Sequence, residues 1–335
     1  MIRVGLIGYG LAGAVFHEPL IRACERLELT AVLTSRDHPL RVGSVEDLLE
    51  RCDLVVVASP NDSHFPLART ALDHGKHVVV DKPFTITLGE ADALIALAHE
   101  TGRMLTVFHN RRWAADFLGV RAILPRLGEL FLVEANWDRF RPEVKRRWRE
   151  QAGPGAGLLA DLGPHMMDEA LQLFGMPEAI SADIFAQRPG ATVDDYFDLR
   201  LEYGRVRVSL RASSLISARR PRFAVHGNGG SFIKHGLDPQ ESQLQAGMDP
   251  HDPDFGIEHG GGTLTLPDGS IEQVAGERGR YLDFYDAVVA AIEDGARVPV
   301  DPGEAREGLF LIDLARRASA LGQRLPVPAS SSTEG

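Results

Sequence analysis

The first 110 residues alternate between short apolar runs and segments in which apolar residues recur at helical spacing. The apolar runs, which predict strands, are residues 2–7, 29–35, 53–60, 76–84 and 103–110. The segments with helical spacing are residues 12–24, 45–52, 64–75 and 88–102. Pro19 is expected to kink or split the first of these helices. The alternation predicts βαβ units and a doubly wound parallel sheet.

The pattern changes near residue 118. Residues 128–140, 196–213 and 221–236 alternate apolar and polar positions and are divided by glycine-containing turns, which is typical of hairpins in an antiparallel or mixed sheet. Helices are expected at 164–174, 281–294 and 303–321. The sequence therefore predicts an α/β protein with a Rossmann domain at 1–118 and a second α/β domain at 119–327. The C-terminal helices can pack back on the first domain, and residues 328–335 are predicted to be a disordered tail.

Composition narrows the class of protein. The 335 residues are enough for about two domains, and 44% of them are hydrophobic, so the chain can build substantial cores. A net charge of −11 argues against nucleic acid as the main partner, because phosphate binding needs a basic face. Two cysteines make no disulfide framework, and neither a secretory signal nor a run of ~18 apolar residues is found. We therefore expect a cytoplasmic protein without a membrane partner.

The most specific motif is Gly8-Tyr9-Gly10-Leu11-Ala12-Gly13, which lies between the first strand and the first helix. The first glycine permits a tight turn, the second allows a pyrophosphate to approach the backbone, and the third allows the helix to pack closely on the strand. The exposed N–H groups at the helix start, Leu11 and Ala12 among them, would then bind the anion. The alternative is a glycine turn without a ligand. In this context the motif predicts a dinucleotide cofactor.

The end of the second strand bears on which dinucleotide is bound. NAD sites usually carry an acidic residue there, which holds the ribose 2′-hydroxyl. Here Ser35 and Arg36 come first and Asp37 follows. A hydroxyl and a guanidinium suit a 2′-phosphate, because arginine pairs with phosphate in a bidentate manner. We therefore predict NADP. NAD remains the alternative, with Asp37 holding the ribose.

Two further segments contain the residue types of an acid–base site. Lys82, in Asp81-Lys82-Pro83, follows a parallel strand at the edge where α/β proteins bind ligands, although it could equally be a surface lysine. Asp161 and His165 are four residues apart and would share one face of a helix. Histidine beside a carboxylate can act as a general base, whereas the plainer interpretation is a helix cap and a buried histidine. No HExxH motif or cysteine cluster predicts a metal site.

Weaker candidates follow the last strand of the first domain and lie in a basic stretch beyond it. His109, Asn110 and Trp113 could line a substrate pocket, or they could belong to a connector. The basic run from 139 to 149, which includes Trp148, could cover an anionic ligand or be a solvated loop. Together with Arg36, Lys82 and Arg111–Arg112, this run predicts a locally positive crevice for the cofactor.

Taken together, the motifs resemble those of the Gfo/Idh/MocA family of NAD(P)-dependent oxidoreductases, over about residues 1 to 325. The matching segments are IGYGLAG (7–13), SPNDSH (59–64), ALDHGKHVVVDKP (71–83) and PGAGLLADLGPHMMDEALQLFG (154–175). FHNRRW (108–113), RWREQ (147–151) and GLDPQESQLQAGMDP (236–250) look most like the subgroup of NADP-dependent scyllo-inositol dehydrogenases. The resemblance implies a Rossmann domain followed by an α/β domain with a large, open, mainly antiparallel sheet. It also implies a homodimer or homotetramer.

The resemblance assigns roles to individual residues. It implies that Lys82 contacts substrate and nicotinamide and that His165 is the general base, with Asp161 beside it. The cofactor-binding residues that it implies are Ser59, Pro60, Asn61, His64, Asp81, Lys82 and Asn110. The chain departs from the family in having Asp81 where a glutamate is usual. It also has only about ten residues between Arg36 and the next helix, where relatives usually have a further helix.

These observations predict an oxidoreductase that transfers a hydride between nicotinamide and a secondary alcohol or ketone of a polyol or sugar, inositol-like in kind. The alternatives are a reductase of a non-sugar carbonyl and a regulator that senses NADP without catalysis.

Overall fold

The computed structural model describes residues 1–145 and 150–328 and divides them into two compact units. Unit 1 consists of residues 1–118, 238–258 and 277–309. Unit 2 consists of residues 119–237 and 259–276 and of the chain from residue 310 onward. Unit 1 thus contains more than the N-terminal 118 residues, because two later segments return to it. Trp148 and nearly all of the predicted tail lie outside the described residues.

Unit 1 is built on a six-stranded parallel sheet. Its strands are β1 (Ile2–Ile7), β2 (Leu27–Leu33), β3 (Arg41–Val42), β4 (Leu54–Val57), β5 (His77–Asp81) and β6 (Leu105–Phe108). They are arranged in the order β3-β2-β1-β4-β5-β6, which is the order of dinucleotide-binding doubly wound folds. The predicted parallel sheet is confirmed.

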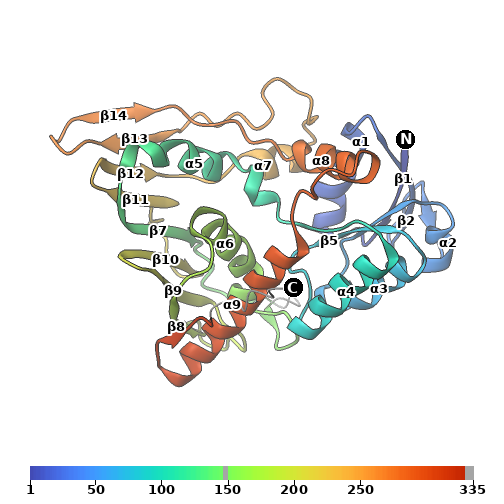
Figure 1. Ribbon diagram of the computed structural model, residues 1–335, viewed down its shortest axis with the longest axis horizontal. Coiled ribbons are helices and arrows are strands. Elements are labelled where there is room, and N and C mark those ends of the chain that lie inside the picture. The colour runs from blue at the N-terminus through green and yellow to red at the C-terminus, as the bar shows by residue number, and fades with distance from the viewer. Residues whose placement is uncertain (146–149, 329–335) are drawn as a thin grey trace, which may run out of the picture. The chain divides into compact units, whose positions relative to one another are not determined.

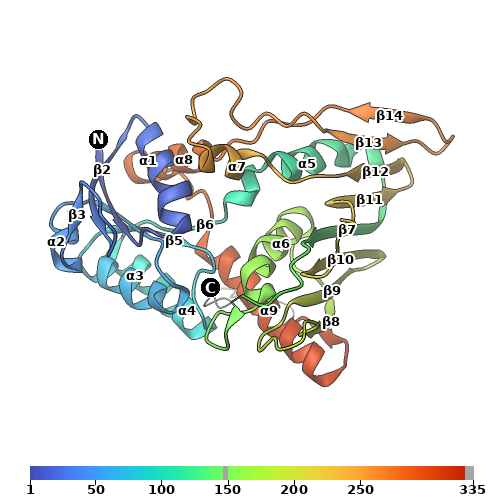
Figure 2. The ribbon, with the colours of Figure 1, turned by 180° about the vertical axis from the view of Figure 1, so that it is seen from behind.

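Helices cover both faces of this sheet. Unit 1 contains η1 (Ala12–His17), α1 (Glu18–Ala23), α2 (Val45–Leu49), η2 (Asn61–Ser63), α3 (His64–Asp73), α4 (Leu88–Thr101), η3 (Asn110–Trp113), α7 (Gln240–Gln245) and α8 (Leu282–Glu293). Figures 1 and 2 show α3 and α4 on one face and α1 with α8 on the other. Because both faces are covered, every residue of β4 is fully buried, as its unbroken apolar run predicts.

Local chemistry explains where these helices begin and end. Thr87 and Glu90 form a reciprocal capping box at the start of α4, and Gly102 ends that helix in the left-handed conformation with φ of 63°. Pro19 is the second residue of α1, and its missing N–H removes one donor from the backbone hydrogen bonding there. The segment before it, η1, is a π-helical turn, so the predicted break at Pro19 is a change of helix type within one continuous rod.

Unit 2 is built on a nine-stranded mixed sheet. Its strands are β7 (Leu130–Asp138), β8 (Ala179–Phe185), β9 (Tyr196–Tyr203), β10 (Val206–Ser213), β11 (Phe223–Gly227), β12 (Gly230–Lys234), β13 (Gly262–Thr265), β14 (Ile271–Val274) and β15 (Leu325–Pro326). The order is β14-β13-β12-β11-β7-β10-β9-β8-β15, and only β7 and β10 pair in parallel. A large, mainly antiparallel sheet is therefore confirmed.

One long helix lies along this sheet within unit 2. Helix α6 (Leu158–Phe174) packs on β9 and β10, as both ribbon views show. Ala135, Leu210 and Leu199 are paired across β7, β10 and β9, so they share one face of the sheet, and all three are buried. Two further helices, α5 (Ala115–Leu127) and α9 (Pro302–Leu321), carry the chain from unit 1 into unit 2.

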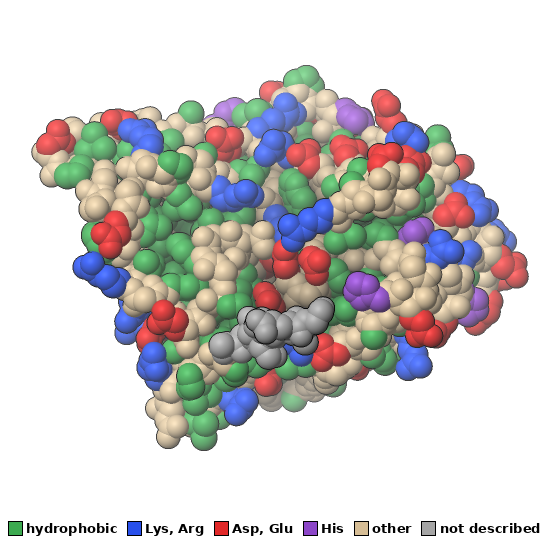
Figure 3. Space-filling view, in the orientation of Figure 1, with side chains coloured by type: hydrophobic (Ala, Val, Ile, Leu, Met, Phe, Trp, Pro, Cys, Tyr) green, Lys and Arg blue, Asp and Glu red, His purple; other side chains and the backbone are tan. Residues whose placement is uncertain are grey.

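The surface carries charged side chains of both signs. On the face drawn in Figure 3, basic side chains are interspersed with acidic ones. Within the described part of the chain, no helix combines the length and apolarity that crossing a membrane requires.

Candidate functional site

The glycine turn after β1 has the three features that its spacing predicts. Gly8 has φ of 95°, and a Cβ there would come within 2.5 Å of the Ala58 carbonyl oxygen. A Cβ on Gly13 would come within 2.2 Å of the Gly8 carbonyl oxygen, so only glycine lets the helix pack this closely. Around Gly10, by contrast, a Cβ would meet nothing within 4 Å.

The helix after this turn begins without a side-chain cap. Leu11 precedes η1 and gives it no side-chain cap, and the helix start has no acidic residue in its first turn. The open space at Gly10 therefore lies beside the positive end of a helix. An arrangement of this kind fits a dinucleotide pyrophosphate, which is the group that the motif predicts.

The residues predicted to bind the adenosine side of the cofactor lie in the short connection after β2. Residues 34–40 join β2 to β3 without a helix, and Ser35 and Arg36 are exposed there. The Arg36 backbone N–H donates to the Thr34 hydroxyl at 3.0 Å, which holds the backbone in a turn. The guanidinium of Arg36 is thus carried on a short, hydrogen-bonded loop at the end of the strand.

A buried carboxylate lies close to the same loop but is already engaged. Glu18 accepts hydrogen bonds from the Tyr9 hydroxyl and from Arg22, the latter at 2.7 Å, and His38 lies 3.4 Å away. Burial raises the pKa of Glu18, but these hydrogen bonds outweigh it and leave the pKa below its usual value. Burial and the bond to Glu18 raise the pKa of Tyr9 to about 12. Glu18 is therefore ionised and satisfied by its own neighbours.

The loops after β4 and β5 meet at one histidine. His64 at the start of α3 is 1% exposed, with Nδ1 2.8 Å from the Pro83 carbonyl oxygen and Nε2 3.0 Å from that of Ser59. The Ser59 and Ser63 hydroxyls are 2.6 Å apart. Lys82 follows β5, its peptide bond to Pro83 is cis, and its N–H donates to the Asp81 carboxylate at 2.8 Å. The structure thus brings Ser59, His64 and Lys82 to one edge of the unit 1 sheet, and Pro60 and Asn61 lie between Ser59 and His64.

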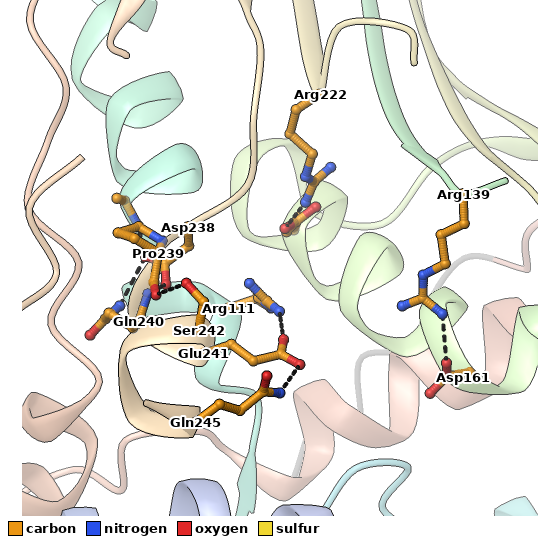
Figure 4. Close-up of polar contacts among 12 residues, drawn as sticks. Arg111, Arg139, Asp161, Arg222, Asp238, Pro239, Gln240, Glu241, Ser242 and Gln245 are labelled. Carbon is orange, nitrogen blue, oxygen red and sulfur yellow. Dashed lines mark hydrogen bonds and ion pairs between the residues drawn. The ribbon is translucent and has the colours of Figure 1, made fainter. Parts of the chain in front are cut away.

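The residues after β6 are more deeply buried than expected. His109 and Asn110 are 4% and 5% exposed, whereas Trp113 is half-buried and its ring lies 5.6 Å from that of Phe284. Arg111 donates to Glu241 at 3.1 Å, and Arg112 donates to Glu304 at 2.7 Å; Figure 4 shows the first pair.

These two ion pairs correct the predicted positive crevice. Burial lowers the pKa of Arg111, but Tyr281 and the carboxylates around it raise the pKa above its usual value. Both guanidinium groups are neutralised inside unit 1, because buried charges are stable only when paired. Arg111 and Arg112 therefore do not contribute the exposed positive charge that the sequence suggested.

The helix that carries Asp161 and His165 begins earlier than predicted. Helix α6 starts at Leu158 instead of residue 164, so Asp161 lies in its first turn and is not its cap. The cap comes from a distant segment: Asp194 accepts from the Leu158 N–H through its carbonyl oxygen at 2.8 Å and from the Leu159 N–H through Oδ2 at 2.6 Å. Gly157, with φ of 101°, is needed because a Cβ would come within 2.2 Å of the Asp194 carboxylate.

Within unit 2, Asp161 and His165 lie one turn apart on α6. The Asp161 carboxylate pairs with Arg139, which follows β7, at 3.5 Å (Figure 4). His165 is 6% exposed, and its ring lies 5.9 Å from the ring of Trp137 in β7. Sequence reasoning placed Arg139 in a basic run and did not predict this pairing. The only available signal was that residue 139 lies near the end of the predicted segment 128–140.

A second ion pair, which is buried, lies one turn further along α6. Glu169 pairs with Arg222, and both are 2% exposed. The Arg222 guanidinium also lies over the rings of Trp137 and Phe223, at 5.0 and 4.1 Å from their centroids. Arg222 is thus linked to the aromatic residue beside His165. The sequence gives no sign of this pairing, because 53 positions separate the two partners.

The predicted site residues therefore form two groups. The predicted cofactor residues and Lys82 belong to unit 1, whereas Asp161 and His165 belong to unit 2. Within the described ranges, no group of three or more His, Cys, Asp or Glu side chains is arranged to hold a metal ion.

Comparison with known proteins identifies relatives along nearly the whole chain. Residues 2–109 match the Gfo/Idh/MocA model described as "Oxidoreductase family, NAD-binding Rossmann fold". Residues 122–328 match the model described as "Oxidoreductase family, C-terminal alpha/beta domain". The chain is 43% identical to the uncharacterized oxidoreductase YdgJ of Escherichia coli (strain K12), over 93% of this chain and 95% of the relative.

Two other relatives extend the comparison. The chain is 37% identical to the scyllo-inositol 2-dehydrogenase (NADP(+)) IolW of Bacillus subtilis (strain 168), over 95% of this chain and 94% of that protein. The solved structure of the YPO2259 putative oxidoreductase from Yersinia pestis superposes with a TM-score of 0.94 at 41% identity and covers 98% of both chains.

Proposed function

Since the chain belongs to the Gfo/Idh/MocA family of oxidoreductases, we propose that it is an NADP-dependent dehydrogenase of a secondary alcohol on a polyol or sugar. The observation that carries the proposal is the glycine turn after β1, where open space at Gly10 adjoins an uncapped helix start. A ligand of this turn is an anion close to the backbone, as a dinucleotide pyrophosphate would be. The similarity to an inositol dehydrogenase supports an inositol-like substrate.

NADP is favoured over NAD by the charges around the adenosine side. Glu18 is occupied by Tyr9 and Arg22, so it is a poor acceptor for a ribose hydroxyl. Arg36 is exposed on the short loop and offers a guanidinium to a 2′-phosphate. We expect Arg36→Ala to weaken NADPH binding by on the order of 10-fold and to leave NADH binding unchanged. Arg51→Ala, which also removes an exposed arginine, is the control. Equal losses for both cofactors would contradict the assignment.

The proposed chemistry assigns one role to each of three residues. When bound, the nicotinamide supplies the hydride acceptor for alcohol oxidation and the hydride donor for ketone reduction. His165 accepts the hydroxyl proton during oxidation and returns it during reduction. The Lys82 ammonium stabilises negative charge that develops on the substrate oxygen. Asp161 orients the histidine or binds a substrate hydroxyl, and Arg139 fixes the position of its carboxylate.

The decisive experiment is replacement of the proposed base. His165→Ala should lower kcat by on the order of 10²–10⁴-fold while NADPH binding persists, because a general base contributes that much to the rate. His99→Ala, at an exposed position of α4, is the matched control. Activity is followed as NADPH absorbance over a panel of polyols, sugars and non-sugar carbonyls. Near-normal turnover by His165→Ala would refute the mechanism.

The same panel separates the alternatives. Turnover of non-sugar carbonyls alone would favour a reductase of that class. NADPH binding without any turnover would favour a regulator that senses the cofactor. We also propose that the protein acts in the cytoplasm. We propose in addition that it is a homodimer or homotetramer, and light scattering after size-exclusion chromatography tests this oligomeric state.

A further inference from the structure

Both ring nitrogens of His64 face backbone carbonyl oxygens. Nδ1 lies 2.8 Å from the oxygen of Pro83 and Nε2 lies 3.0 Å from the oxygen of Ser59. A carbonyl oxygen can only accept a hydrogen bond, so each nitrogen must donate. A neutral imidazole carries one N–H and would direct a lone pair at the other oxygen. With 1% of the side chain exposed, solvent offers little to compensate for that repulsion.

We propose that His64 is an imidazolium that joins the two loops at the nicotinamide end of the site and thereby acts as a positioning residue. One loop, Ser59–Ser63, follows β4, and the other, which contains Lys82 and Pro83, follows β5. This role differs from direct cofactor contact, which the sequence predicted for His64, because both nitrogens are already bonded to the protein backbone.

Four other ionisable groups lie near His64 or its partner Pro83 in the sequence, or interact with His64. Asp81 and Lys82 directly precede Pro83, Asp62 lies two positions before His64, and His17 of η1 interacts electrostatically with both His64 and Asp81. Burial lowers the pKa of His17 to about 4, against the opposing effect of Asp81. His17 is therefore neutral near pH 7. Asp81 lies two positions before Pro83, so the segment that His64 contacts carries a carboxylate as well as the Lys82 ammonium.

The consequence concerns the geometry of catalysis. The inference rests on the proposed function only where it refers to Lys82. This lysine follows β5 and is joined directly to Pro83, whose carbonyl oxygen His64 contacts. A double donor fixes that loop against the Ser59 loop, so a shift in one is carried to the other. Reacting groups tolerate little misplacement, so loss of either bond is expected to be visible in the kinetics.

The first test needs neither cofactor nor substrate. In protein labelled with ¹⁵N-histidine, long-range ¹H–¹⁵N correlation spectra at pH 7 distinguish an imidazolium, with two protonated nitrogens, from either neutral tautomer. The His64 signal is assigned as the one missing from His64→Asn. Two protonated nitrogens are expected for His64. A neutral ring would overturn the proposal and leave the proposed dehydrogenase activity untouched.

The second test uses two variants that each restore one bond. An asparagine amide reaches the position of Nδ1, and a glutamine amide reaches that of Nε2. His64→Asn should keep the bond to Pro83, so the KM for NADPH should rise by on the order of 10-fold with kcat nearly unchanged. His64→Gln should keep the bond to Ser59 and free the Lys82 loop, so kcat should fall by on the order of 10-fold with KM nearly unchanged. Identical effects of the two substitutions would show a merely structural role and overturn the proposal.

Discussion

Two helices in this protein begin after a glycine-rich segment, and they use the same local sequence pattern in opposite ways. In unit 1, Gly8–Gly13 leads into η1, and the space at Gly10 is open. In unit 2, Gly155–Gly157 leads into α6, and the space at Gly157 holds the Asp194 carboxylate. The first helix start leaves its N–H groups available to a ligand, whereas the second is satisfied by an anion that the chain itself supplies.

The difference teaches that a glycine-rich segment before a helix predicts an anion at the helix start. It does not predict whether that anion is a side chain of the protein or a ligand. Both starts offer N–H groups and the positive end of a helix dipole. At α6 the anion is covalently part of the protein, so it contributes to stability. At η1 the matching anion has to come from outside, so the same geometry contributes to binding. The predictions below test this contrast, from the largest expected effect to the smallest.

The largest effect, on NADPH affinity, is expected when a methyl group is added in the glycine turn Gly8–Gly13. Gly13→Ala should weaken NADPH binding roughly 1,000-fold, or about 4 kcal/mol, because its Cβ would overlap the Gly8 carbonyl oxygen at 2.2 Å. Isothermal titration measures the affinity. Gly89→Ala in α4 is the matched control, because a Cβ there meets nothing within 4 Å. Unchanged affinity in Gly13→Ala would contradict the assignment of this turn to the pyrophosphate.

A smaller effect is expected on the pH dependence of stability, through a histidine of η1. His17 lies on η1, with Nδ1 2.7 Å from the Tyr285 hydroxyl, and burial lowers its pKa from 6.5 to about 4. The unfolded chain then binds this proton more readily than the folded protein does. Stability from this residue is therefore complete above pH 6.5 and is lost as pH falls toward 4. The loss amounts to about 3 kcal/mol.

Denaturant unfolding of the wild type and of His17→Gln at pH 7 and pH 4.5 measures this contribution. The variant should be less stable at pH 7 but should lose less stability on acidification. If both proteins lose the same free energy of unfolding between the two pH values, His17 is not the group responsible.

The smallest effect is expected at the second helix start. Asp194→Ala removes the acceptor for the Leu159 N–H but leaves the carbonyl oxygen that binds the Leu158 N–H. Loss of such a cap costs about 1–2 kcal/mol, which calorimetry would detect as a lower Tm. Asp194→Asn keeps an oxygen at this position and should recover part of the loss. NADPH affinity should be the same in both variants, and a large drop would contradict the contrast between the two starts.

Local patterns explain which parts of the fold could be predicted. The strands of unit 1, the stop at Gly102 and the turn at Gly8–Gly13 depend on neighbouring residues, so the sequence contains the relevant information. The predicted start of α6 was wrong because the residue that caps this helix, Asp194, lies more than thirty positions beyond the helix start. Pro164, at the predicted start, instead lies inside the helix, in its second turn.

The same distinction between local and distant contacts applies to the candidate site. The positions of Ser59 and Lys82 at one sheet edge follow from strand order and could be foreseen. The partners of Arg139, Arg111 and Arg222 could not, because each ion pair joins segments that are distant in sequence. A run of basic residues does not reveal which of its members is neutralised by folding. The roles of Asp161 and His165 and the identity of the substrate stay predictions.

The composition of unit 1 from three separate segments has a consequence for biosynthesis. Its sheet is encoded by the first 118 residues, yet Arg111 pairs with Glu241 and His17 contacts Tyr285. On the ribosome, the N-terminal segment therefore emerges long before the residues that neutralise and cover it. Until residue 241 has left the exit tunnel, Arg111 would lack its carboxylate, and the last segment of unit 1 emerges only with residue 309. A stalled or truncated product would lack these contacts and be a ready substrate for chaperones and proteases.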